Sequence, residues 1–128
     1  ARFIGTPPMN LLPLERGEAD ALVTGTGGPA VAPADCAGLT LGVRPEHITL
    51  AFDRGVPATV AAIEYLGADT LVTCRLGAAT LAVRVAGSVG LARGDAVRLA
   101  WAPGAQHFFD REGVRRADLA PESATMFA

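Results

Sequence analysis

Residues 44–47, Arg-Pro-Glu-His, place a cation, a carboxylate and an imidazole within four positions. Arginine binds carboxylate or phosphate groups through a rigid fork of N–H donors, and histidine titrates near neutral pH. The segment could therefore hold a small anion or form an acid–base pair. In an extended segment, however, Arg44 and Glu46 would share a side that His47 leaves. The other interpretation is a strand end that Pro45 stiffens and a contact between Arg44 and Glu46 fixes.

Residues 25–30, Gly-Thr-Gly-Gly-Pro-Ala, superficially match the glycine fingerprint of dinucleotide-binding folds. That fingerprint requires a helix that begins directly after the glycines and points its amides at pyrophosphate. Pro29 and Pro33 are incompatible with such a helix. The segment is therefore predicted to be a hairpin turn, and we expect no cofactor-binding residues in this chain.

Other reactive side chains are few and widely spaced. His47 and His107 are the two histidines, and Cys36 and Cys74 belong to no Cys-x-x-Cys pair. Nothing in this spacing selects a metal site or a disulfide, and we expect two buried thiols. The two serines lie outside any Gly-x-Ser-x-Gly motif. We expect neither catalytic nor metal-binding residues.

Composition points to one folded domain. The 128 residues are 50% hydrophobic and 19% charged, with a formal net charge of −2, which disfavours a disordered tail and a nucleic-acid partner. All 11 basic residues are arginines, so a phosphate-binding loop ending in Gly-Lys-Ser/Thr is excluded. No apolar run approaches the ~18 to 20 residues that span a bilayer. We therefore expect a cytoplasmic, non-enzymatic domain.

Short alternating runs between glycines and prolines predict an all-β fold. The clearest strand covers residues 80–86, where Leu81, Val83 and Val85 alternate with Ala82 and Arg84. Similar short runs mark the other segments. The predicted strands are 9–14, 21–24, 39–43, 58–66, 70–76, 80–86 and 97–101.

Turn residues set how these strands connect. Residues 67–69, Gly-Ala-Asp, predict a hairpin between 58–66 and 70–76, and a second turn leads into 80–86, so the three should form an antiparallel meander. Pro13 cannot donate to a strand ladder, which predicts that 9–14 is an edge strand. Residues 111–128 are expected to form a short helix or a frayed tail.

Five phrases occur in an order that resembles one family. They are FIGTPPMN at 3–10, LGVRPEH at 41–47, IEYLGADT at 63–70, GD at 94–95 and HFFD at 107–110. The chain resembles the C-terminal regulatory domain, of the transport-associated OB (TOBE) type, in ATP-binding subunits of importers of the maltose and glycerol-3-phosphate kind. The match covers nearly the whole chain and thins after Asp110.

The resemblance implies an OB-like fold of small β-barrels built from short antiparallel strands. It implies a connector at 1–10 to an ATPase core that precedes it, a regulatory barrel at 11–110 and a variable tail at 111–128. The chain would then be an excerpt of a longer subunit, as its start without Met also suggests. ATP and Mg would bind to the ATPase core, and this part would need no cofactor.

The resemblance also implies partners. The domain would pair with its copy in a second subunit, contact its own ATPase core, and join an importer peripheral to the inner membrane, with a regulatory protein or small ligand as a further partner. The family phrase around the subunit contact holds Arg44, Glu46 and His47. The residues that would form the connector are Phe3, Ile4, Pro7, Pro8, Met9 and Asn10.

A second hypothesis is a ligand-binding barrel that senses a small anion or a sugar phosphate. Arg44, His47 and threonine or backbone donors would supply its site. A calorimetric screen with oxyanions and sugar phosphates distinguishes the two hypotheses.

Overall fold

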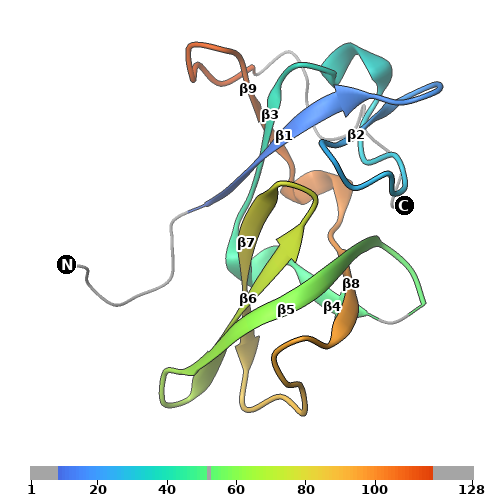
Figure 1. Cartoon of the computed structure of the whole chain (residues 1–128). Coiled ribbons are helices and arrows are strands. Elements are labelled where there is room, and N and C mark those ends of the chain that lie inside the picture. The colour runs from blue at the N-terminus through green and yellow to red at the C-terminus, as the bar shows by residue number, and fades with distance from the viewer. Residues whose placement is uncertain (1–8, 52, 117–128) are drawn as a thin grey trace.

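The computed structural model describes residues 9–51 and 53–116. In this part of the chain, antiparallel strands form a four-stranded sheet of order β2-β1-β3-β9 and a five-stranded sheet of order β4-β8-β5-β6-β7 (Figure 1). The fold is all-β and OB-like, as the sequence predicts. The strands are β1 Asn10–Arg16, β2 Ala21–Val23, β3 Thr40–Val43, β4 Thr49–Ala51, β5 Val56–Tyr65, β6 Asp69–Leu76, β7 Ala79–Ala86, β8 Ala96–Ala100 and β9 His107–Phe109.

Three short 3-10 turns connect these strands: η1 Ala34–Cys36, η2 Pro45–His47 and η3 Pro103–Ala105. None of the helical segments in the described ranges is long and apolar enough to cross a membrane. The predicted meander is confirmed, because β5 pairs with β6 and β6 with β7 in antiparallel register. Gly67 and Gly77 occupy its two turns with φ of 93° and 58°, a region that glycine enters without steric cost.

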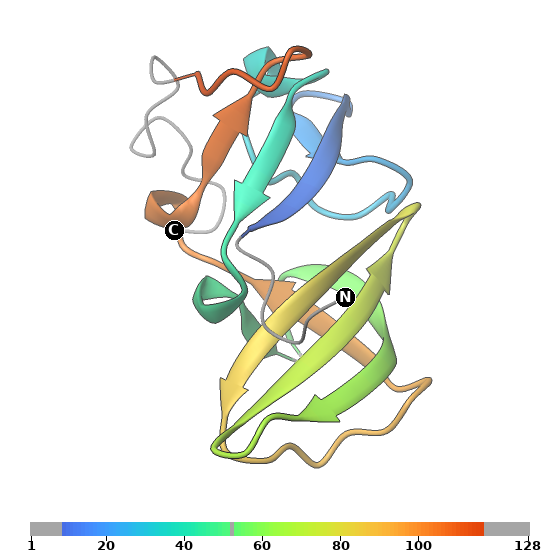
Figure 2. The same cartoon turned by 90° about the vertical axis from the view of Figure 1, so that its left-hand side faces the viewer.

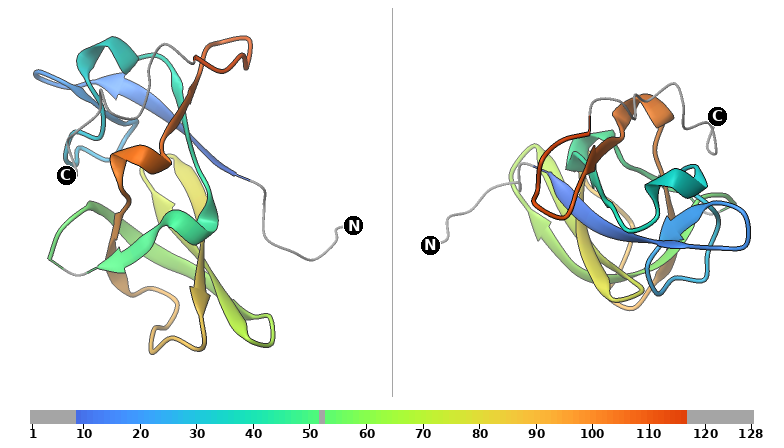
Figure 3. Two further views of the ribbon diagram at one scale, coloured as in Figure 1. Left: turned by 180° about the vertical axis from the view of Figure 1, so that it is seen from behind. Right: turned by 90° about the horizontal axis from the view of Figure 1, so that it is seen from above.

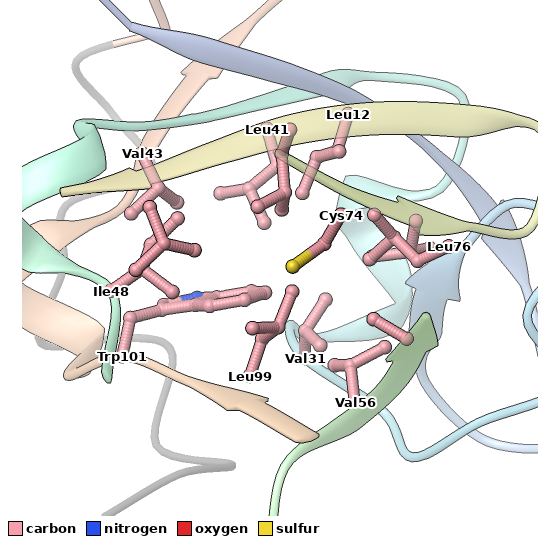
Figure 4. Packing of buried hydrophobic residues seen from close by; sticks show 14 of the residues in the cluster. Leu12, Val31, Leu41, Val43, Ile48, Val56, Cys74, Leu76, Leu99 and Trp101 are labelled. Carbon is pink, nitrogen blue, oxygen red and sulfur yellow. The ribbon is translucent and has the colours of Figure 1, made fainter. Parts of the chain in front are cut away.

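The two sheets share one hydrophobic core. They are stacked in Figure 2, and their buried side chains form a single cluster. Figure 4 shows Leu41 of β3 and Cys74 of β6 facing the same interior, with the Trp101 ring beneath them. Each fully buried aliphatic side chain contributes roughly 1.5 to 3 kcal/mol relative to an exposed one. One core therefore holds both sheets in a fixed arrangement.

Both cysteines contribute to this core. Cys36 and Cys74 are buried and unpaired, as expected. Burial raises the pKa of each thiol to about 11, and at Cys36 the carboxylate of Asp35 adds to this rise. The thiolate is the reactive form of cysteine. Neither side chain is therefore a nucleophile at neutral pH.

The prediction that 9–14 is an edge strand is wrong. β1 lies between β2 and β3. Pro13 is tolerated there because the β1–β2 ladder begins only at the next residue, Leu14, opposite Val23. Pro13 still accepts a hydrogen bond of 2.9 Å from the Thr24 amide through its carbonyl group. Pro13, which has no N–H group, therefore lies just beyond the end of the β1–β2 ladder, so it removes none of the hydrogen bonds of that ladder.

Asn10 joins the two sheets directly. Its side-chain Nδ2 donates to the Ala82 carbonyl group at 2.8 Å, and its Oδ1 accepts from the Ala82 amide at 2.8 Å. Asn10 belongs to β1, whereas Ala82 belongs to β7, the edge strand of the other sheet. One buried carboxamide therefore satisfies the two backbone groups as a neighbouring strand would, and it closes part of an exposed sheet edge.

The described part of the expected tail, 111–116, forms a turn rather than a helix. Arg115 pairs with Phe109 in an isolated antiparallel bridge, and the Arg116 amide donates to the Phe108 carbonyl group at 2.7 Å. Asp110 sets the turn, because its Oδ1 accepts from the amides of Glu112 and Val114. Residues 117–128 lie outside the described part.

Candidate partner-binding surface

The segment around Arg44, Glu46 and His47 is a 3-10 turn rather than an extended strand end. β3 ends at Val43, and η2 begins two residues later with Pro45, whose fixed φ suits the first position of a helical turn. The expected separation of His47 from the other two side chains assumed an extended chain, and that assumption is wrong. Pro45 is buried while Arg44, Glu46 and His47 are all exposed.

Packing of the turn explains this exposure. Pro45 and Ile48 are buried and hold η2 on the body of the protein, where it contacts β7 at the level where the two sheets meet (Figure 3). Glu46 and His47 lie between these two anchors and Arg44 directly precedes the first, and all three project into solvent. The turn therefore presents Arg44, Glu46 and His47 on a fixed backbone.

His107 lies beside this turn, which the sequence alone did not indicate. It pairs with Gly42 across β3 and β9, two residues before Arg44 on the same face of the sheet. Burial lowers the pKa of His107, and the positive charges of Arg115, Arg44 and His47 lower it further. The structure thus gathers basic side chains from η2, β9 and the turn after β9 in one region.

This cluster predicts a pH dependence of stability. Because the folded-state pKa of His107 lies below its ordinary value of 6.5, protonation favours the unfolded chain. The contribution of His107 is therefore complete above about pH 6.5 and is lost as the pH falls below it. We expect a His107→Gln variant to lose less unfolding free energy between pH 7 and pH 5 than the unaltered chain, as measured by urea unfolding. Equal losses in the two proteins would contradict this assignment.

Apolar side chains adjoin the basic cluster on the outer face of the four-stranded sheet. Met9 and Phe109 cover Gly42, at which a Cβ atom would collide with the Met9 sulfur and come within 2.8 Å of the Phe109 ring. Leu11 is 57% exposed beside them and lines a cavity of about 360 Å³ with Met9, Thr40 and Phe109. Arginine, methionine and aromatic residues are enriched at protein interfaces. This face, with Arg44, has that composition.

The predicted connector is only partly within the described residues. The part of the chain that the structure describes does not include Phe3, Ile4, Pro7 and Pro8. Met9 packs over Gly42, and Asn10 holds β7. The role of these residues as a joint to an ATPase core stays a prediction.

The described residues contain no group of three or more His, Cys, Asp or Glu side chains that could hold a metal ion. Residues 25–30 follow β2 as a turn, and the next helical segment in the described part is η1, which begins at Ala34. The loop has the non-helical form that the sequence predicts. It borders a cavity that also contains Arg75 and Arg98, two residues that the sequence did not single out.

Comparisons with known proteins confirm the resemblance to the TOBE domain that the sequence motifs indicated. A family model for the TOBE domain matches residues 41–109. The sn-glycerol-3-phosphate import ATP-binding protein UgpC of Cereibacter sphaeroides is 42% identical over 120 residues, which cover 91% of this chain and 34% of that protein. Proteins of the same name match from Salmonella choleraesuis, at 37% identity, 91% of this chain and 35% of that protein, and from Chromohalobacter salexigens, at 38%, 100% and 37%.

The chain thus spans about a third of the length of these relatives. The family match runs from the second residue of β3 to the end of β9, and so includes the whole five-stranded sheet and the Arg44–His47 turn. The chain belongs to the TOBE domain family.

Proposed function

We propose that this chain is the regulatory domain of an importer ATP-binding subunit and carries no catalysis itself. The observation that carries the proposal is the match of 91% of the chain, at 37 to 42% identity, to proteins named as glycerol-3-phosphate import ATP-binding proteins. The ATP- and Mg-binding residues would belong to a part of the parent subunit outside this chain. The membrane subunits of the importer would be indirect partners.

Within the parent subunit, the domain would pair with its copy in a second subunit. The surface formed by Arg44, Glu46, His47, His107 and the adjoining apolar face supports this role. Arg44 and His47 are exposed on a turn that the core holds in place, so association has to order their side chains but not their backbone. Glu46 adds an acid to a mostly basic region, so two copies related by a two-fold axis could exchange charge contacts.

The first test concerns nucleotide. We expect the 128-residue chain neither to bind nor to hydrolyse ATP, because it has no lysine for a phosphate loop. Calorimetry with ATP and Mg²⁺, together with a phosphate-release assay, measures both properties. Hydrolysis that survives purification to homogeneity would contradict the proposal. The coding sequence upstream of Ala1 is a second check, and the proposal expects ATPase motifs in the same reading frame.

A further inference from the structure

A cavity of about 410 Å³ lies on the outer face of the five-stranded sheet, away from the Arg44 turn. Strands β5, β6 and β8 form its floor, and the loop after β2 and the β6–β7 turn form a wall. In Figure 2 that turn extends to the loop after β2, so the cavity has walls from both sheets. Ligand pockets commonly measure roughly 300 to 1,000 Å³. The cavity is therefore large enough for a small organic molecule.

Strand register places two arginines in this cavity. Arg98 of β8 pairs with Pro57 of β5, and Arg75 of β6 pairs with Thr59 of β5. Paired residues of antiparallel strands point to the same face, and so do alternate residues of one strand. Arg75 and Arg98 thus flank β5 on one face, with Thr59 between them.

The two guanidinium groups have different surroundings. Nη1 of Arg98 donates to the Gly55 carbonyl group at 3.0 Å, which restrains the side chain and leaves further N–H donors for a ligand. Arg75 makes neither an ion pair nor a hydrogen bond within 9–51 and 53–116. At the rim, the Glu15 carboxylate accepts from the Gly25 amide at 3.1 Å and keeps its negative charge. The described residues that line the cavity include both arginines and neither an aspartate nor a glutamate.

The glycine-rich loop provides a wall rather than ligand donors. The Gly25 amide donates to Glu15, and the Gly28 amide donates to the Thr26 hydroxyl group at 3.1 Å. A Cβ atom on Gly28 would lie 3.0 Å from Cδ of Pro57, so glycine lets the loop approach β5. Donors for a ligand would thus come from Arg75, Arg98 and the Thr59 hydroxyl group.

We propose that this cavity binds a small molecule through a phosphate group, with Arg75 and Arg98 as its anchors. A phosphate group carries up to two negative charges and several acceptor oxygens, and guanidinium groups match both. Inorganic phosphate and a phosphate ester share this chemistry, although the cavity has room for the ester. A ligand held between walls from both sheets would also stabilise their arrangement. The site differs from the anion site that the sequence suggested, because neither Arg44 nor His47 lines it.

Titration calorimetry on the chain tests the site with three probes in a phosphate-free chloride buffer. The probes are inorganic phosphate, glycerol 3-phosphate, which the names of the relatives suggest, and uncharged glycerol. We expect saturable binding of a phosphate-bearing probe and none of glycerol. Tighter binding of the ester identifies an organic phosphate as the ligand, weaker binding of the ester identifies free phosphate, and equal binding shows that the site recognises the phosphate group alone. The absence of binding by both phosphate probes at millimolar concentration would overturn the proposal.

Three variants locate the binding. Arg75→Gln and Arg98→Gln should each weaken it at least about tenfold, because each removes charged hydrogen bonds to the ligand. Arg111→Gln removes an exposed arginine from the turn after β9 and should leave binding unchanged. Arg98 also holds Gly55, so its variant could unfold, whereas Arg75 has no such contact. Unchanged affinity in a folded Arg75→Gln variant would overturn the assignment. All of these readouts are independent of subunit pairing, so this proposal and the proposed function can fail separately.

Discussion

An Asn10→Asp substitution is expected to lower the free energy of unfolding by about 3 to 5 kcal/mol at pH 7. The carboxylate could still accept from the Ala82 amide but could not donate to the Ala82 carbonyl oxygen, which it would face at hydrogen-bond distance. The side chain at this position is also 5% exposed, so the new charge would lose most of its hydration. Urea unfolding followed by circular dichroism measures the loss.

The pH dependence of this variant provides an internal check. Once protonated, the introduced carboxyl group has an O–H donor again, so the deficit should shrink as the pH falls toward about 4, the ordinary pKa of aspartic acid. Leu11→Asp is the control, because it adds the same charge at a neighbouring position that is 57% exposed and should cost only about 1 kcal/mol, from lost apolar contact and the low β-propensity of aspartate. If both variants lose equally little, the Asn10 bridge does not hold the sheets together.

A Gly77→Ala substitution should be the second strongly destabilising change. The added Cβ atom would overlap the Thr24 carbonyl oxygen and lie 2.9 Å from the backbone of Gly25. Backbone atoms cannot move aside as a flexible side chain can, so the β6–β7 turn and the loop after β2 must separate. We expect a loss of at least about 2 kcal/mol beyond the cost of placing alanine at a positive φ, which is itself about 1 kcal/mol.

Gly27→Ala isolates that conformational cost. Gly27 lies in the loop after β2 with φ of 60°, close to the 58° of Gly77, and a Cβ atom there would meet nothing within 4 Å. The difference between the two alanine variants in thermal or urea unfolding therefore reports the contact between the two sheets. Equal losses at Gly27 and Gly77 would show that close backbone approach at this turn contributes nothing to stability.

Local patterns in the sequence were sufficient for most strands. Alternation of Leu81, Val83 and Val85 predicted β7, and the glycine turns at 67 and 77 predicted the meander, because these signals depend only on neighbouring residues. The expectation of two buried thiols rested instead on the wide spacing of the cysteines and the absence of a Cys-x-x-Cys pair. The Pro13 edge prediction failed because the position of a strand within a sheet depends on its partners, which are later segments of the chain.

The hydrogen bonds between the two sheets could not be predicted either, because they also depend on segments that are distant in the sequence. Asn10 and Ala82 are 72 residues apart, and no local pattern marks an asparagine that bonds to a distant backbone.

The arginine-lined cavity could not be predicted from local patterns. In the sequence, Arg75 and Arg98 look like ordinary exposed residues of alternating strands. The pairing of both residues with β5 places them in one cavity.

The sequence identified the candidate surface through the Arg-Pro-Glu-His motif at 44–47 and did not predict its geometry. Arg44, Glu46 and His47 drew attention as a group, but the 3-10 turn that exposes all three depends on burial of Pro45 and Ile48 against a core that other strands complete. His107 joins them only because β9 pairs with β3. The sequence therefore identified the residues of one turn, and the structure added His107, whose pKa the charges of Arg44 and His47 lower.

The most direct test of the account is the self-association of the parent subunit. Sedimentation equilibrium should be run on the unaltered subunit, on Arg44→Ala and on Arg93→Ala, with nucleotide binding measured in parallel. Arg93 is the control because it is an exposed arginine of the loop between β7 and β8, outside the proposed surface. We expect Arg44→Ala to weaken pairing at least about tenfold, because arginine is enriched among the interface residues whose truncation costs most, while nucleotide binding and the Arg93→Ala control stay unchanged. Pairing of the Arg44→Ala subunit with undiminished affinity would contradict the assignment of this surface to the subunit contact.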